Sequence, residues 1–340
     1  MAEHLPRVAV ILAGGLGTRL RPLTWHLPKG LLPVANRPLL SYELEWLARA
    51  GVEQVILAVA EQAEAIEAGL GHECRGMELV YRRESARLDT AGALKNAAGE
   101  VGESFWALNG DLIFDFEPAP LVRRHRESGA ALTLALRRVE EIAAYGLVRR
   151  DESGRVTAFL EKQATDPTGE NLVNFGVYLI EPMTLEGVPA GQKYSNERQL
   201  FPELVASGAT VVGFLPEDIV YWSDVGRLET YLQANHDLLA GALPWLEPEI
   251  AATALVGAGA GILSPCALGD QAVIGAGAVL GPYVSVGAQA VIGSGARIVR
   301  SVILPGATIG SQAHLEEVVV ASGEVVPDGH YQQGGVVSHE

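Results

Sequence analysis

Residues 8–24 read VAVILAGGLGTRLRPLT, and residues 28–33 follow with PKGLLP. The apolar run Val8–Leu12 at the start of this stretch predicts a buried strand. The residues after the run are rich in glycine, at Gly14, Gly15 and Gly17. Because glycine has no Cβ atom, its neighbouring backbone N–H groups can turn toward an anion. The stretch therefore predicts a phosphate-binding loop that follows a strand.

Two cations accompany this loop, Arg19 and Lys29, and both can balance the charge of a triphosphate. Two other phosphate-binding motifs also begin with a strand and glycines, and neither fits. The P-loop requires a Lys followed by Ser or Thr, whereas Gly17 is followed by Thr18 and Arg19. The dinucleotide-binding fingerprint requires a third glycine where Arg19 stands.

The whole string, G-G-x-G-T-R-L-x-P-L-T followed by P-K-x-L-L-P, resembles the signature of the sugar-1-phosphate nucleotidyltransferases. The resemblance implies an α/β domain with a Rossmann-like, mostly parallel sheet. It also implies transfer of a nucleotidyl group from an NTP to a sugar 1-phosphate, with Arg19 holding the leaving phosphates and Lys29 approaching the α-phosphoryl group. The nucleotide-binding residues that it implies in the loop are Ala13, Gly14, Gly15, Gly17 and Thr18.

Two aspartates match the residues that bind Mg²⁺ in this family: Asp111, in LNGD, and Asp224, in YWSDVG. Two carboxylates together with phosphate oxygens suit this hard ion. The segment 89–92, DTAG, resembles the loop that faces the base and the ribose. The further nucleotide-binding residues implied by the resemblance are Thr90, Ala91, Gly92, Asn109 and Gly110.

The sugar-phosphate side of the site is implied by shorter matches. Glu161 and Lys162 resemble the family's E-K-P, in which the lysine holds the sugar phosphate and the glutamate accepts sugar hydroxyls, although Gln163 replaces the proline. Asn174, in VNFGVY, matches an N-x-G-x-Y segment that lines the sugar site. Gly146 matches another sugar contact.

Residues 1 to about 235 alternate apolar strand patterns with helical patterns, which predicts a mostly parallel sheet with both faces covered. Residues 55–60 are one such strand. Before it, Leu40, Leu44 and Leu47 have helical spacing, and Gly51 is typical of a helix C-terminus. Ligands of such sheets bind beyond the carboxyl ends of the strands, so we expect the glycine loop and the LNGD segment to face one cleft.

After about residue 251 the chain has hardly any charge and repeats with a period of six. Hexapeptide periodicity predicts a left-handed parallel β-helix of about three to four coils, in which the aliphatic residues stack in the interior. These residues are Leu268, Ile274, Leu280, Val286, Ile292 and Ile298, and after a five-residue step Ile303, Ile309 and Leu315. The predicted organisation is a nucleotidyltransferase domain at 1–240, a linker at 241–255, the β-helix at 256–325 and a tail at 326–340.

Composition and charge limit the classes of partner that we expect for this protein. The 340-residue chain has a net charge of −16, which argues against nucleic acid as a partner. No apolar run approaches the roughly 20 residues of a membrane span, and no signal-peptide pattern precedes residue 8, so we expect a cytoplasmic protein that does not enter a membrane. Cys74 and Cys266 are far apart, without the spacing of a disulfide or a metal site.

The substrates remain open at this stage. The LNGD segment and the short β-helix look most like mannose-1-phosphate guanylyltransferases, which favours GTP and mannose 1-phosphate. Glucose-1-phosphate uridylyl- or thymidylyltransferases are the alternative, and a non-catalytic, sugar-nucleotide-binding regulatory subunit is an alternative of another class. An acyltransferase β-helix would use a histidine base, for which the repeats offer only His314. We expect a homo-oligomer that assembles through the β-helix.

Overall fold

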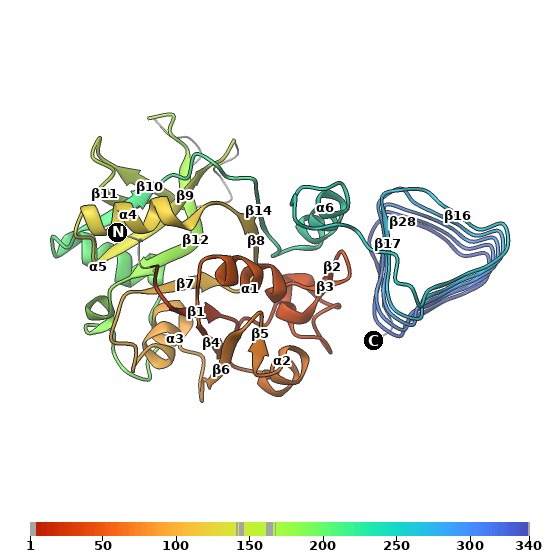
Figure 1. Ribbon diagram of the computed structural model, residues 1–340, viewed down its shortest axis with the longest axis horizontal. Coiled ribbons are helices and arrows are strands. Elements are labelled where there is room, and N and C mark those ends of the chain that lie inside the picture. Colours follow the sequence, from red (N-terminus) through yellow and green to blue (C-terminus); the bar gives the residue numbers. More distant parts are fainter. Residues whose placement is uncertain (1–4, 141, 143–145, 161–165, 167, 339–340) are drawn as a thin grey trace. The chain divides into compact units, whose positions relative to one another are not determined.

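The computed structural model describes residues 5–338 except 141, 143–145, 161–165 and 167. The chain forms two compact units, and each unit joins two stretches of sequence. The first unit contains Met1–Gly15 and Glu43–Ile219, and the second contains Leu16–Tyr42 and Val220–Glu340. Figure 1 traces both by colour along the chain. The linear division at residues 240 and 255 stays a prediction.

A mixed sheet forms the centre of the first unit. Its parallel part has the order β7 (Phe105–Asn109), β1 (Val8–Leu12), β4 (Gln54–Val59) and β6 (Met77–Arg83). Beside β7, β12 (Leu172–Ile180) runs antiparallel. The sheet is completed by β5 (Glu73–Cys74), β9 (Leu132–Arg138), β10 (Leu147–Arg150), β11 (Val156–Leu160) and β13 (Val211–Phe214). The strand predicted at Val8–Leu12 is confirmed with the same bounds, and the strand predicted at 55–60 begins and ends one residue earlier, as β4.

Helices cover both faces of this sheet, as predicted. Phe105 and Ala107 of β7 share a buried core with α3 (Asp89–Ala97). Trp106, which lies between them in sequence, packs edge-on against Trp46 of α1 (Leu40–Arg49), with ring centroids 5.1 Å apart. Because successive strand residues point to opposite faces, α3 and α1 cover opposite faces.

The predicted helical spacing places Leu40, Leu44 and Leu47 on the buried side of α1, where all three are fully buried. Gly51 follows the helix with a φ of 76°. The other helical segments of this unit are α2 (Ala63–Leu70), α4 (Pro118–Glu127), η3 (Pro182–Leu185), η4 (Asn196–Leu200) and α5 (Phe201–Ala206), and a further strand is β8 (Leu112–Asp115). No helix within the described part of the chain is long and apolar enough to cross a membrane.

The second unit contains a three-sided parallel β-helix, seen end-on as a stack of triangular coils in Figure 1. Each side is a five-stranded parallel sheet. The first sheet contains β15 (Leu255–Val256), β18 (Val273–Ile274), β21 (Val291–Ile292), β24 (Thr308–Ile309) and β27 (Val325–Val326). The second contains β16 (Gly261–Ile262), β19 (Val279–Leu280), β22 (Arg297–Val299), β25 (His314–Glu316) and β28 (Tyr331–Gln333). The third contains β17 (Cys266–Leu268), β20 (Val284–Val286), β23 (Val302–Ile303), β26 (Val319–Val320) and β29 (Val336–Val337).

The hexapeptide pattern correctly identifies the interior of this β-helix. All nine predicted aliphatic positions, from Leu268 to Leu315, are at most 1% exposed. The β-helix is nevertheless longer than predicted, because β28 and β29 lie within residues 326–340, where we expected a tail. Gln332 stacks on Leu315 in this last coil. A terminal coil has a neighbour on one side only, so it tolerates a polar residue at an interior position, and the aliphatic repeat is lost there.

The rest of the second unit contains residues 16–42, which are called the signature segment from here on, together with one further strand and one long helix. The signature segment forms the short helices η1 (Thr18–Leu20) and η2 (Lys29–Leu31) and a hairpin of β2 (Pro33–Val34) and β3 (Arg37–Pro38). After β14 (Tyr221–Asp224), α6 (Leu228–Leu239) leads toward the β-helix.

Candidate functional site

In the first unit, two predicted nucleotide-binding segments lie side by side at the carboxyl ends of parallel strands. Residues 13–15 follow β1 and residues 109–111 follow β7, and Leu12 pairs with Asn109. The Gly110 N–H donates to the Leu12 carbonyl at 3.1 Å. A Cβ atom on residue 110 would lie 2.7 Å from the same oxygen, so the close approach of the two segments requires glycine. Residues 13–15 and 109–111 therefore share one edge of the sheet within this unit, and the cleft that we expect them to face stays a prediction.

Ala13 and Gly14 also contact the neighbouring strands. The Ala13 N–H donates to the Ala58 carbonyl at 2.9 Å, which extends the hydrogen bonding of the sheet one residue beyond β1. A Cβ atom on residue 14 would lie 3.3 Å from Oε1 of Glu84. Burial raises the pKa of Glu84, whose other oxygen accepts the Leu88 N–H at 3.0 Å. This carboxyl group beside the glycine loop is not recognisable from the sequence, because a single Glu after a strand belongs to no motif.

In the second unit, the signature segment folds around Gly17. This residue has a φ of 59° and precedes η1, and the Thr24 hydroxyl donates to its carbonyl at 2.9 Å. A Cβ atom at position 17 would lie 2.9 Å from Cγ2 of Thr24 and 3.2 Å from Cβ of Lys29. The glycine turn and the predicted catalytic lysine are therefore neighbours, while Thr18 is exposed on η1.

The same unit brings Arg19 and Asp224 close together. A Cβ atom on Gly226 would lie 2.9 Å from Nη2 of Arg19 and 2.9 Å from Oδ1 of Asp224. Arg19 is exposed, and Asp224 ends β14. A predicted phosphate-binding cation and a predicted metal-binding carboxylate thus belong to one local cluster, from segments about 200 residues apart in sequence.

The residues predicted to face the base and the ribose lie at the start of α3. Their backbone N–H groups already donate to oxygen atoms of the protein. Ala91 and Gly92 donate to the Tyr194 carbonyl at 2.8 and 3.0 Å. The Thr90 hydroxyl accepts the Asn196 N–H at 2.7 Å. A Cβ atom on residue 92 would lie 2.6 Å from the Gln192 carbonyl, so the packing against residues 192–196 by itself explains this glycine.

A hydrogen-bond chain connects the predicted sugar-side residue Asn174 to the predicted nucleotide-side residue Asn109. The Asn174 amide donates to the Tyr178 hydroxyl at 2.7 Å and to Oε1 of Glu197 at 2.8 Å, and its Oδ1 accepts the Gly176 N–H at 3.0 Å. Tyr178 is buried, which raises its pKa, and its hydroxyl also bonds the Asn109 side chain. Asn174 therefore orients its neighbours, and it holds one oxygen of the exposed Glu197.

Glu197 is not among the residues predicted from the sequence, and Tyr178 enters that prediction only as part of a motif. Glu197 lies on η4, which begins after Ser195, and the Ser195 Oγ accepts the Arg198 N–H at 3.4 Å. A serine before a charged stretch is a helix-start signal, so the element could be anticipated. The contact with Asn174 joins residues 23 positions apart in different elements, and no local pattern encodes it.

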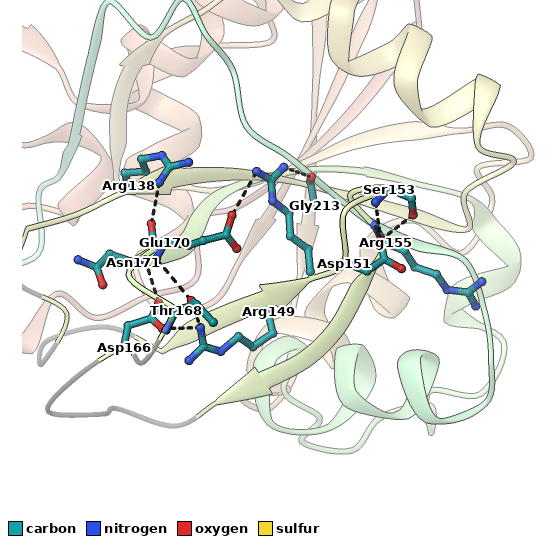
Figure 2. Close-up of polar contacts among 11 residues, drawn as sticks. Arg138, Arg149, Asp151, Ser153, Arg155, Asp166, Thr168, Glu170, Asn171 and Gly213 are labelled. Atoms are coloured by element: carbon teal, nitrogen blue, oxygen red, sulfur yellow. Dashed lines mark hydrogen bonds and ion pairs between the residues drawn. The ribbon is translucent and has the colours of Figure 1, made fainter.

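Gly146 is exposed and directly precedes β10. Glu161 and Lys162 lie outside the described residues. Figure 2 shows the polar contacts of the segments near them in sequence. Asp166 accepts the backbone N–H groups of Thr168 and Asn171 at 2.8 and 2.9 Å and forms an ion pair with Arg149.

Although burial opposes ionisation of Asp166, the hydrogen bonds from Thr168 and Asn171 and the ion pair with Arg149 hold its pKa well below the usual range. In the same region, Glu170 pairs with Arg150 at 3.7 Å. Asp166 and Glu170 are thereby held to two arginines of β10.

The predicted metal ligands belong to different units, Asp111 to the first and Asp224 to the second. Within the described residues, no group of three or more His, Cys, Asp or Glu side chains could hold a metal ion by itself. Carboxylate oxygens are suitable ligands for Mg²⁺, which commonly completes its shell with substrate phosphates and water. Each carboxylate by itself suits an ion that binds together with a triphosphate, and a single ion shared by Asp111 and Asp224 stays a prediction.

Comparison with known proteins identifies the family. Residues 8–241 match the model of the nucleotidyl transferase family, and residues 262–338 match the GMPPB C-terminal domain. This chain belongs to the nucleotidyl transferase family.

Two curated relatives illustrate the extent of the similarity. Mannose-1-phosphate guanylyltransferase of Mycobacterium tuberculosis is 38% identical over 239 residues, which cover 69% of this chain and 66% of that protein. The probable mannose-1-phosphate guanylyltransferase 1 of Oryza sativa subsp. japonica is 32% identical over 97% of this chain and 95% of its own length.

A solved structure is similar as well. HddC from Yersinia pseudotuberculosis, crystallised in complex with GMP-PN, is 26% identical, with a TM-score of 0.58. The similarity covers 68% of this chain and 99% of that one. The predicted α/β fold of the N-terminal part is thus confirmed by a solved structure.

Proposed function

We propose that this protein transfers a nucleotidyl group from a nucleoside triphosphate to a sugar 1-phosphate, giving an NDP-sugar and pyrophosphate. The observation that carries the proposal is the signature segment. Arg19 and Lys29 both stand at its cationic positions, in a chain of the nucleotidyl transferase family. A subunit that only binds sugar nucleotides has no need of both cations.

The reaction depends on positioning and charge neutralisation more than on acid–base chemistry. An oxygen of the sugar phosphate attacks the α-phosphorus, the bond from that phosphorus to the bridging oxygen breaks, and pyrophosphate leaves. Arg19 would hold the leaving phosphates, and Lys29 would neutralise charge at the α-phosphoryl group. Lys162 would align the attacking phosphate.

Asp111 and Asp224 are the proposed ligands of Mg²⁺. The ion would supply positive charge for the phosphate oxygens when it is bound. Nucleotide contacts are proposed for the loop residues 13–15, 17 and 18 and for residues 90–92, 109 and 110. The backbone N–H groups of Ala13, Ala91 and Gly92 already donate to protein carbonyls, so we do not assign these N–H groups to the nucleotide.

For the sugar phosphate, we propose contacts with Gly146, Glu161 and Lys162. The contacts of Asn174 favour an indirect role, because both of its amide polar atoms already bond protein groups. Glu197 is the better candidate for a sugar hydroxyl, since the carboxylate is exposed and one oxygen is held in place by Asn174.

GTP and mannose 1-phosphate are the proposed pair. The names of the mycobacterial and rice relatives support this choice, as does the GMP-PN bound to the Yersinia protein. The similarity covers less than two thirds of the mycobacterial protein, so its name supports the N-terminal part of the chain only. The rice relative extends the support over both parts.

We also propose that the protein is a homo-oligomer that assembles through the β-helix. The first sheet carries an outward ladder in which Leu255, Val273, Val291, Thr308 and Val325 stack in register. Its aliphatic members are 36–64% exposed. A flat apolar strip on a regular surface fits an identical strip on a second copy.

Pyrophosphate release in the presence of Mg²⁺ tests the activity. The matrix combines GTP, UTP, dTTP, ATP and CTP with the 1-phosphates of mannose, glucose, N-acetylglucosamine and galactose. We expect the largest kcat/KM for GTP with mannose 1-phosphate. A preference for UTP or dTTP with glucose 1-phosphate would correct the pair. Binding of sugar nucleotides without any pyrophosphate release would favour a regulatory subunit instead.

A further inference from the structure

The signature segment packs with the β-helix, although it follows a strand of the sheet in the first unit. Leu16–Tyr42 belongs to the same compact unit as the β-helix, not to the unit of the sheet whose strand β1 it follows. The segment carries Arg19 and Lys29, the two cations proposed for catalysis. The contacts that join it to the β-helix therefore decide where these cations are held.

The hairpin of β2 and β3 is the part of the segment that makes these contacts. Its turn residues Ala35 and Asn36 have φ angles of 46° and 64°, and a turn with two such residues matches the twist of a tight hairpin. Helix α6 supports the turn from one side. The Ala35 N–H donates to Oδ1 of Asn235 at 2.8 Å, and the Tyr231 hydroxyl donates to the Pro33 carbonyl at 2.5 Å.

Asn36 connects the turn directly to the β-helix. Its Nδ2 donates to the Val286 carbonyl at 2.9 Å, and its Oδ1 accepts the Ser285 hydroxyl at 2.9 Å. Ser285 is 1% exposed and sits on β20 between Val284 and Val286, which both point into the β-helix interior. A buried hydroxyl on the outer face of a coil needs a partner, and Asn36 provides it.

Helix α6 is fixed to the same region of the β-helix. His236 Nε2 lies 3.0 Å from the Arg300 carbonyl, and its Nδ1 lies 3.2 Å from Nη2 of Arg300. Since the guanidinium can only donate, the imidazole is neutral and carries its proton on Nε2. Arg300 also lies over the Tyr283 ring, 5.5 Å from the centroid, and pairs with Glu317 at 3.1 Å. Helix, hairpin and coil form one hydrogen-bonded assembly.

Little chain separates Lys29 from this assembly. Lys29 begins η2, and its carbonyl accepts the Leu32 N–H at 3.1 Å. The Leu32 carbonyl in turn accepts the Leu39 N–H, also at 3.1 Å, across the base of the hairpin. Gly30 packs so closely on Leu40 that a Cβ atom would lie 2.4 Å from its Cδ1. A shift of the hairpin therefore shifts Lys29.

We propose that Asn36 is a positioning residue, through which coil residues Ser285 and Val286 of the β-helix hold Lys29 in place for nucleotidyl transfer. This inference rests on the proposed function. It gives the β-helix a role in catalysis that is separate from assembly. A displacement of about 1 Å in a catalytic group can cost about 100-fold in rate, so a few hydrogen bonds at the turn are enough to matter.

Asn36→Gly is the variant that isolates the side chain. Glycine adopts a φ of 64° without strain, so the turn keeps its backbone while both hydrogen bonds to the β-helix are lost. We expect kcat to fall about 10-fold, with KM for both substrates within about 3-fold of wild type, because Lys29 acts on the transition state. Ser285→Ala removes one of the two bonds and should lower kcat about 3-fold. The double variant should match Asn36→Gly within about 2-fold, because both changes remove the same contact.

A matched control separates positioning from loss of stability. Ile309→Ala opens a cavity in the β-helix interior, on a strand of a different sheet from β20. It should lower the unfolding midpoint at least as much as Asn36→Gly and leave kcat unchanged below that midpoint. A readout independent of activity is hydrogen exchange, in which the Ala35 amide should exchange faster in Asn36→Gly and not in Ile309→Ala.

The possible outcomes are distinct. If the wild-type protein releases no pyrophosphate with any substrate pair, the proposed function fails, and faster exchange at Ala35 in Asn36→Gly would still support the anchor itself. If wild type is active and Asn36→Gly keeps its kcat within about 2-fold, the positioning role is refuted. An equal loss of kcat in Ile309→Ala would also overturn it, because the effect would then follow stability.

Discussion

The signature segment brings a positive charge and a left-handed turn close together in space. Lys29 supplies the charge, and Gly17 supplies a left-handed turn whose Cα faces the base of the lysine side chain. The sequence predicts both features, because the glycine pattern and the cation are local. It does not predict that Thr24 closes the turn by donating to the Gly17 carbonyl.

Replacing Lys29 should affect turnover more than binding. In Lys29→Ala we expect kcat to fall by at least about 100-fold, because one preorganised charge at the reacting phosphate is removed. Steady-state pyrophosphate release measures this loss. Arg126→Ala, in the last turn of α4, removes an equal charge from a helix that carries no proposed site residue and should leave kcat unchanged. Near-normal turnover of Lys29→Ala would refute its catalytic role.

Gly17→Ala should reduce stability. A left-handed conformation costs an alanine about 1–2 kcal/mol, and the new methyl group would lie 2.9 Å from Thr24 Cγ2. We therefore expect the free energy of unfolding in urea to fall by about that amount. Gly15→Ala is the control, because φ is not in the left-handed region there and no atom lies within 4 Å of the added methyl. Equal stability of the two variants would contradict the strained turn.

Elements with a periodic sequence pattern are predicted correctly. The last coil of the β-helix and contacts between different elements are not. The hydrophobic run of β1, the spacing of α1 and the hexapeptide repeat each depend on residues within one element, and all three are confirmed. The last coil was missed because Gln332 breaks the aliphatic repeat. The Asn174–Glu197 contact was missed because it joins two elements that no local pattern relates.

The packing of α4 on β9 contains a buried histidine whose ionisation should affect stability. His125 is 3% exposed; its Nδ1 lies 2.8 Å from the Thr133 hydroxyl and its Nε2 lies 3.1 Å from Glu181. Burial lowers the pKa of His125, against the opposing effect of Glu181. The folded protein therefore favours the neutral imidazole.

This depressed pKa sets the sign of a pH dependence. The stabilisation from neutral His125 is complete above the ordinary pKa of 6.5 and is lost as the pH falls below it, since the unfolded chain then binds a proton more readily. Urea unfolding at pH 7.5 and 5.5 should show a smaller decrease in the free energy of unfolding for His125→Gln than for wild type. The difference should be at most about 1.4 kcal/mol, because pH 5.5 lies one unit below the ordinary pKa of 6.5. His236, whose pKa is also lowered by burial, keeps a residual dependence in that variant. Identical slopes would exclude His125.

For the molecule as a whole, the sequence predicts an α/β domain followed by a β-helix, and the structure has both in this order. The sequence does not predict which stretches of the chain belong to which compact unit. A linear reading assigns residues 16–42 to the domain whose first strand precedes them. Tertiary contacts with α6 and β20 assign them to the unit that contains the β-helix. Those contacts join Ala35 to Asn235 and Asn36 to Val286, across 200 and 250 residues of sequence, so periodicity and local motifs carry no information about them.

Assembly through the apolar ladder can be tested by placing charges on it. Val273→Glu combined with Val291→Glu puts two carboxylates at adjacent rungs, where they would be buried against a second copy at high cost. Light scattering after size exclusion should show an oligomer for wild type and a monomer for this variant, at equal concentration. Gln271→Glu with Gln289→Glu adds the same charge two residues before each rung, at exposed positions, and should remain an oligomer. A monomeric wild type would refute assembly. An oligomer that survives the two valine changes would show that assembly uses another surface. If the valine variant is a monomer that still releases pyrophosphate, the contact of Asn36 with β20 and the apolar ladder on the first sheet serve separate purposes.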